Sequence, residues 1–105
     1  MEIYHDKENH SFYAIVEGLK CVVDYDVCGE IIEIYHTYVP ESLRGRGIAG
    51  ELTDAVSKYA VENNLKIKPI CSYAVSFYRR NFEKYKNILS EGSLENDGAC
   101  RIKKI

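Results

Sequence analysis

The fold is decided by the stretch Tyr35–Gly50, which reads YHTYVPESLRGRGIAG. The residues from Glu30 to Val39 are rich in β-branched and aromatic side chains, which predicts a strand that ends at Pro40. Beyond the glycines, apolar side chains recur at the spacing of one helix face. These are Ile48, Leu52, Ala55, Val56, Tyr59 and Ala60. The chain therefore reads strand, glycine-rich turn, helix.

The turn Arg44-Gly45-Arg46-Gly47 has the properties of an anion site. The first turn of a helix has N–H groups without partners inside the helix, and the macrodipole adds positive potential there. Glycines let a ligand approach this backbone, and the two arginines add positive charge. We expect a phosphate or diphosphate to bind here. The alternative is an ordinary turn with two solvated arginines.

One motif at this turn is Gly45-x-Gly47-x-x-Gly50, which satisfies the dinucleotide fingerprint. That fingerprint needs an acidic residue at the end of the next strand to hold a ribose. The next predicted strand, Leu65–Cys71, ends without one, and the chain is too short for a doubly wound sheet. A P-loop is excluded because no Lys-Ser or Lys-Thr follows the glycines.

A second motif uses the same residues, Arg44-x-x-Gly47-x-Ala49. It resembles the acetyl-coenzyme A signature of the Gcn5-related N-acetyltransferase (GNAT) superfamily. The preceding HTYVP at 36–40 and the CSY at 71–73 are similar to the small, single-domain YjdJ-type branch. The resemblance covers about residues 25–82. It implies a GNAT-like acyl-CoA N-acyltransferase fold, in which two parallel strands splay apart and the pantetheine arm lies between them.

Composition sets the class of protein. With 105 residues and 46% apolar content, we expect a single domain, 1–105. The net charge of −2 gives no sign of a nucleic-acid partner. No apolar run approaches membrane-spanning length and the N-terminus is unlike a signal peptide, so we expect a cytoplasmic protein with no membrane partner. The four cysteines have no zinc spacing, so we expect free thiols and no metal.

The order of the predicted elements indicates a mixed α/β (α+β) fold. An antiparallel N-terminal meander should be followed by a parallel β-α-β crossover and a C-terminal helix. The predicted strands are Glu2–His5, Ser11–Glu17, Leu19–Tyr25, Glu30–Val39 and Leu65–Cys71. The first helix should stop at Asn63-Asn64, and the second should cover Val75–Tyr85. Residues 86–105, with Ile88–Leu89 and Cys100–Ile105, should form a loose tail or a short edge strand.

The resemblance implies where acetyl-coenzyme A, the co-substrate, would bind. The diphosphate would be held by the turn and the start of the helix. The residues concerned are Arg44, Gly45, Arg46, Gly47, Ile48, Ala49 and Gly50. The amide-rich pantetheine arm would pair with the open backbone of Tyr38 and Val39, and a main-chain N–H near these residues would stabilise the oxyanion.

Three side chains are catalytic candidates. Cys71 could accept the acetyl group or line the acetyl pocket, and His36 could deprotonate it or an incoming amine. The alternatives are a buried, inert cysteine and a packed strand histidine. Tyr78, in a Phe-Tyr pair that resembles one of the superfamily, could instead protonate the departing thiolate. Its alternative is an aromatic residue of the core.

These observations favour an N-acetyltransferase that transfers acetyl to an amine. The acceptor is unknown, and a small molecule or a protein or peptide amine would each suit an open site. The main alternative is a non-catalytic module that binds acetyl-coenzyme A or coenzyme A. A dinucleotide-binding fragment is a third possibility.

Overall fold

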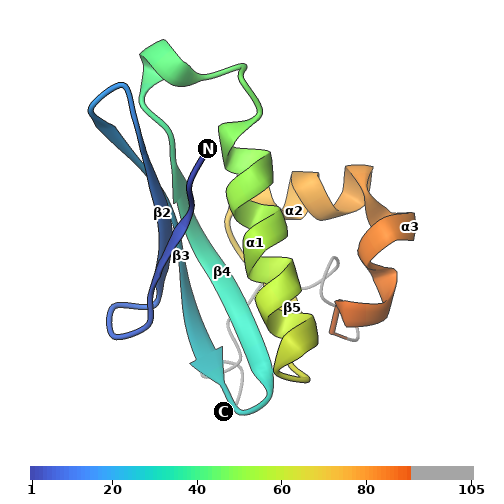
Figure 1. Cartoon of the computed structure of the whole chain (residues 1–105). Helices are drawn as coiled ribbons and strands as arrows, with labels where there is room; N and C mark the ends of the chain where they lie inside the picture. Colours follow the sequence, from blue (N-terminus) through green and yellow to red (C-terminus); the bar gives the residue numbers. More distant parts are fainter. Residues whose placement is uncertain (91–105) are drawn as a thin grey trace.

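A five-stranded mixed sheet with strand order β1-β2-β3-β4-β5 carries the fold (Figure 1). The computed structural model describes residues 1–90. The elements are β1 (Tyr4–Asp6), β2 (Ser11–Val16), β3 (Leu19–Cys28), β4 (Ile31–Tyr38), η1 (Glu41–Leu43), α1 (Ile48–Glu62), β5 (Lys66–Pro69), α2 (Ser72–Arg80), α3 (Phe82–Tyr85) and η2 (Lys86–Ile88). Strands β1 to β4 are antiparallel, and β5 is parallel to β4. The predicted meander and crossover are therefore confirmed.

The three α-helices lie on one side of the sheet, with α1 mainly against β2 and β3 and α2 against β4 and β5 (Figure 1). We call the side covered by α1 the helix face and the opposite side the far face. Cys21, Val23 and Tyr25 alternate along β3 and are almost fully buried on the helix face. They pack with the apolar stripe of α1, of which Leu52, Val56 and Ala60 are fully buried. This contact forms the centre of the hydrophobic core.

Several element boundaries differ from those predicted. Helix α2 begins at Ser72 rather than at Val75, because the chain leaves the extended conformation directly after Cys71. It ends at Arg80, where the Asn81 side-chain amide donates to the carbonyl of Phe77 and a separate helix α3 follows. The first strand is Tyr4–Asp6 rather than Glu2–His5, and β3 continues to Cys28. The predicted stop of the first helix at 63–64 is correct.

The segment after α3 returns to the sheet. Leu89 forms a parallel bridge with Ile67, and the N–H of Ser90 donates to the carbonyl of Ile67 at 2.9 Å. Residues 88–89 therefore lie at the outer edge of β5. This position agrees with the expected edge strand rather than with a loose tail. The other predicted piece, Cys100–Ile105, lies outside the described residues.

The cysteines follow the prediction in part. Cys21 and Cys71 are free. Cys28, at the end of β3, is disulfide-bonded, so the expectation of four free thiols is wrong at that position. Among residues 1–90, no cluster of three or more His, Cys, Asp or Glu side chains could hold a metal ion. None of the helices described is both long and apolar enough to cross a membrane.

The short strand β1 is held by an aromatic cluster that contains a histidine. His5 stacks on Phe12 with ring centroids 3.9 Å apart and meets Tyr59 of α1 edge-on at 4.6 Å. Its Nε2 is hydrogen-bonded to the Tyr25 hydroxyl at 2.6 Å. Burial lowers the pKa of His5 and raises the pKa of Tyr25 to about 12. The cluster is therefore built for a neutral imidazole.

We expect the free energy of unfolding to depend on the charge of His5. The folded-state pKa of His5 lies below the ordinary value of about 6.5. The stabilisation that the neutral imidazole contributes is therefore fully present above about pH 6.5. The contribution is lost as the pH falls through the folded-state pKa. Urea unfolding at pH 7.5 and pH 5 should show a larger loss of stability on acidification for the parent than for His5→Phe. Phenylalanine keeps the ring stacking but cannot titrate, so equal losses would contradict this role.

Candidate functional site

The site begins where β4 and β5 separate. Their parallel pairing runs from Ile31 and Lys66 to Ile34 and Pro69 and then ends. The Ile34 carbonyl accepts the N–H groups of both Ile70 and Cys71, at 2.8 and 3.1 Å, as β5 turns into α2. Strand β4 continues to Tyr38, paired with β3 on its other side. The last part of β4 therefore has an edge from which β5 has diverged.

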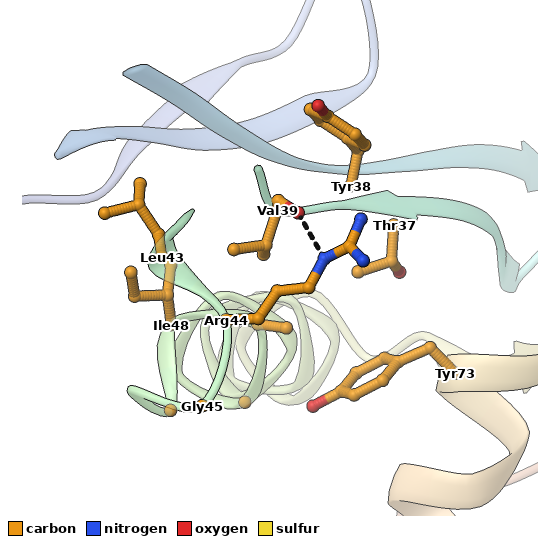
Figure 2. Close-up of a pocket in the computed structure, with 11 residues that line it drawn as sticks. Thr37, Tyr38, Val39, Leu43, Arg44, Gly45, Ile48 and Tyr73 are labelled. Carbon is orange, nitrogen blue, oxygen red and sulfur yellow. Dashed lines mark hydrogen bonds between the residues drawn. The ribbon is translucent and has the colours of Figure 1, made fainter. Parts of the chain in front are cut away.

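A pocket of about 370 Å³ lies beside this edge (Figure 2). It is bounded by the end of β4, the glycine-rich turn, the first turn of α1 and the first turn of α2. Its lining residues are Thr37, Tyr38, Val39, Leu43, Arg44, Gly45, Gly47, Ile48, Ala49, Gly50 and Tyr73. Eight of the nine residues predicted to bind the cofactor are in this set, so the structure brings them together around one pocket.

The backbone at the start of α1 is arranged as an anion site. Gly47 is the N-cap residue in the left-handed conformation (φ 79°), and it has no side chain to cap the helix. The first N–H inside the helix to find a carbonyl is that of Glu51, which donates to Gly47. The amides of the preceding turn line the pocket and cannot be satisfied by the helix itself. A Cβ built at Gly47 would meet nothing within 4 Å, so the approach to these amides is open.

The two arginines of the turn have different positions. The Nε of Arg44 donates to the Val39 carbonyl at 2.8 Å, which places its side chain between β4 and Tyr73 (Figure 2). Arg46 instead forms a 2.8 Å ion pair with Glu17, in the turn between β2 and β3, and does not line the pocket. The positive charge inside the site therefore comes from Arg44.

The two candidates for covalent catalysis are not brought together. The Cys71 Sγ lies 3.5 Å from the Thr37 Oγ1 on the helix face. In the ladder with β3, Thr37 faces the buried Val23, whereas His36 faces Asp24 on the far face. His36 is exposed there. Adjacent strand residues point to opposite faces, so Thr37, not His36, is the neighbour of Cys71.

The predicted acid Tyr78 lies in the core rather than in the pocket. Its side chain is fully buried, and its hydroxyl is 2.6 Å from the Ser57 Oγ of α1. Ser57 donates its own proton to the Thr53 carbonyl, so Tyr78 is the donor to Ser57. Burial raises the pKa of Tyr78 far above its ordinary value. The phenol is therefore held as a neutral donor inside the helix packing.

A tyrosine that lines the pocket on the same side of β4 as α1 is Tyr73, in the first turn of α2 (Figure 2). Its hydroxyl lies 3.7 Å from where a Cβ on Gly50 would stand, an ordinary contact distance, so the ring packs against the start of α1. Burial raises the pKa of Tyr73, and Arg80 acts in the opposite direction. Sequence reasoning assigned no role to Tyr73 or Thr37, although both belong to the two motifs that carried the resemblance.

A second hollow, of about 450 Å³, adjoins the first. Both are lined by Gly47 and Gly50, so the start of α1 lies between them. The second is bounded by α1, α2 and α3 and contains the aromatic side chains Phe77 and Tyr85 together with Lys58 and Lys84. Both pockets therefore share the first turn of α1 as a wall.

Comparisons with known proteins agree with this architecture. Residues 11–88 match the family model for GCN5-related N-acetyltransferases. The chain is 32% identical over 84 residues to protein NATD1 of Gallus gallus, covering 77% of this chain and 76% of that protein. It is 34% identical over 84 residues to NATD1 of Danio rerio, which again covers 77% of this chain and 76% of that protein. A GCN5-like protein of Staphylococcus aureus, solved by NMR, matches with a TM-score of 0.67 and 26% identity, covering 99% of this chain and 96% of that one.

Replacement of Tyr78 should affect the stability of the protein more than replacement of Tyr73. Tyr78→Phe removes the hydrogen bond to Ser57 and should lower the free energy of unfolding by about 1 kcal/mol. Tyr73→Phe, the matched change at the pocket, should alter it by less than about 0.5 kcal/mol. Urea unfolding measures both values. A Tyr78→Phe protein as stable as the parent would contradict the structural role of this hydroxyl.

Proposed function

Because this chain belongs to the GCN5-related N-acetyltransferase family, we propose that it binds acetyl-coenzyme A and transfers the acetyl group to an amine. In this reaction the amine nitrogen forms a bond to the carbonyl carbon, the carbon–sulfur bond breaks, and the proton lost by nitrogen ends on the thiol sulfur. The coenzyme supplies the activated acetyl group, and the chain supplies the binding, alignment and proton transfer.

The observation that carries the proposal is the position of the α1 amides at the gap between β4 and β5. A diphosphate bound at Gly47, Ile48 and Ala49 would satisfy N–H groups that the helix cannot satisfy. The edge of β4 beside this point offers backbone groups to the amides of a pantetheine arm. The same site thus has donors for an anion and a strand edge for an extended amide chain.

The pocket on the other side of the α1 amides would take the adenosine half of the molecule. Phe77 and Tyr85 offer aromatic surface for an adenine, and Lys58 and Lys84 offer positive charge for its 3′-phosphate. Asp54 lies in the same pocket and is engaged by Tyr85, whose hydroxyl donates to it at 2.6 Å. Lys58 and Lys84 also pair with Asp54, at 3.5 and 3.9 Å. A phosphate bound there would therefore share the two lysines with this carboxylate.

At the acetyl end, the geometry favours direct transfer. Cys71 and Thr37 are in contact near the end of the edge, where they would border the acetyl group. Tyr73 lines the pocket from α2, and its phenol holds its proton at neutral pH, where burial raises the pKa still further. We assign to Tyr73 the protonation of the leaving thiolate. Transfer through Cys71 would require a base on its own face of the sheet, and His36 lies on the other face.

A module that binds acetyl-coenzyme A without turnover is the second candidate. The three side chains first selected for catalysis are His36, Cys71 and Tyr78. The observation that favours this candidate is that no two of them lie next to each other. The two candidates share the binding site and differ in whether a panel of amines is acetylated. Release of free coenzyme A thiol, measured with each amine, distinguishes them.

Gly47→Asp should weaken acetyl-coenzyme A binding at least tenfold more than Gly47→Asn, as measured by isothermal titration calorimetry. Both side chains tolerate the left-handed conformation and have nearly the same shape, but only aspartate puts a negative charge beside the diphosphate. Asparagine therefore controls for the added bulk and the backbone strain. Equal affinity of the two variants would show that no diphosphate lies at this turn.

Tyr73→Phe should lower kcat by about 10²-fold, which is the effect of removing a general acid. Tyr78→Phe and Cys71→Ala should each retain at least about a tenth of the parent kcat, because neither side chain is assigned to proton transfer. The measurement is steady-state acetylation of one amine at saturating acetyl-coenzyme A.

A covalent route would give a different pattern in the same set of variants. Cys71→Ala would abolish turnover, and mass spectrometry would find an acetyl group on Cys71 after incubation with acetyl-coenzyme A alone. Either result would replace direct transfer by transfer through the cysteine.

A further inference from the structure

A row of aromatic side chains crosses the far face of the sheet. The strand register places Tyr4 opposite Tyr13, Tyr13 opposite Val22 and Val22 opposite Tyr38. The rings of Tyr4 and Tyr13 stack at 5.2 Å with an interplanar angle of 28°. Tyr4 and Tyr38, at the two ends, are 43% and 47% exposed. We call these four residues the tyrosine row.

One end of the tyrosine row opens into the proposed acetylation site. Tyr38 lines the pocket, yet its side chain projects from β4 to the side opposite Tyr73 and α1 (Figure 2). A molecule lying on the row would therefore reach the edge of β4 from the far face. The coenzyme would reach the same edge from the helix face, so the two could meet without competing for space.

The row is already in contact with a primary ammonium group. The Nζ of Lys20 lies 4.7 Å from the centroid of the Tyr13 ring, which is within the range of a cation–π interaction. Carboxylates flank the row. The negative charge of Glu2 raises the pKa of the Tyr4 phenol, and Asp24 stands two residues from Val22 on the same face, opposite His36. Aromatic faces and carboxylates together favour a cationic ligand.

The direction and length of the row restrict the form of this ligand. The row runs across the strands, so a polypeptide that pairs along a strand would not follow it. Three inter-strand spacings separate Tyr4 from Tyr38, a span of about 14 Å. A linear aliphatic polyamine has ammonium groups for the ring faces and carboxylates, and its methylene segments can pack on Val22 and the tyrosine rings.

We propose that the tyrosine row is the acceptor-docking surface and that the acceptor is a linear aliphatic polyamine, acetylated on its terminal primary amine at the β4 edge. The inference rests on the proposed function and adds the substrate class and the residues that select it. The terminal ammonium first releases one proton to bulk water. The neutral amine then forms the bond to the carbonyl carbon, and its second proton ends on the coenzyme sulfur, while the remaining ammonium groups stay on the row.

The test compares spermine with butylamine, which has one amine and no further charge, as acceptors for the full chain. We expect the parent to have a kcat/KM for spermine at least tenfold above that for butylamine. Tyr13→Leu should reduce this ratio about fivefold, whereas Tyr13→Phe, which keeps the ring face, should retain it. Lys20→Gln should raise the ratio, because it frees the Tyr13 ring and removes a positive charge. Ile15→Ala is the matched control, since Ile15 is exposed on β2 of the same face but outside the row.

The possible outcomes test polyamine docking and acetyl transfer as two separate claims. Equal ratios in the parent and Tyr13→Leu, or a higher kcat/KM for the lysine of a short peptide than for spermine, would overturn the tyrosine row as a polyamine site. If no amine is acetylated, the proposed catalysis fails, and docking is then judged by NMR titration with spermine alone. Shifts of the Tyr13 and Tyr38 ring resonances would support docking, and their absence would overturn it. Cooperative unfolding of each variant establishes that it is folded.

Discussion

The structure depends on the loss of hydrogen-bond pairing between β4 and β5 after Ile34. The carbonyl of Ile34 receives two N–H donors as β5 turns away, and beyond it the two strands no longer share a ladder. This divergence leaves a strand edge in the middle of the sheet, next to the amides that open α1. The position of the pocket beside this edge follows from it. The family relationship agrees with this arrangement, since residues 11–88 contain all of these features.

Local sequence patterns predicted the scaffold because local physics determines it. The change from β-branched residues to a glycine turn and then to an apolar stripe identified β4, the turn and α1, and the pocket that results contains most of the predicted binding residues. Arg46 was an exception, because its ion pair with Glu17 depends on the tertiary position of the β2–β3 turn. Such a contact between distant residues leaves no pattern in the sequence.

The catalytic candidates were harder to predict because they depend on register. Strand β4 has one extra residue at Tyr35 relative to β3, since Asp24 faces His36 while Tyr25 faces Ile34. This β-bulge decides which of His36 and Thr37 lies on the helix face, and a pairing shift is not readable from one strand alone. Likewise, α2 begins three residues earlier than predicted, which includes Tyr73 in its first turn. The Cys-Ser-Tyr motif was the available signal for that residue.

The hydrogen bond from Arg44 to Val39 has a consequence for solubility. A strand edge with unused backbone groups invites pairing with another chain, and proteins commonly protect such edges with charged side chains. The guanidinium of Arg44 covers one carbonyl of the edge and places a positive charge in front of it. A second molecule adding a strand there would have to displace this group and bury its charge. The arginine that faces the ligand pocket thus also guards the protein against edge-to-edge aggregation.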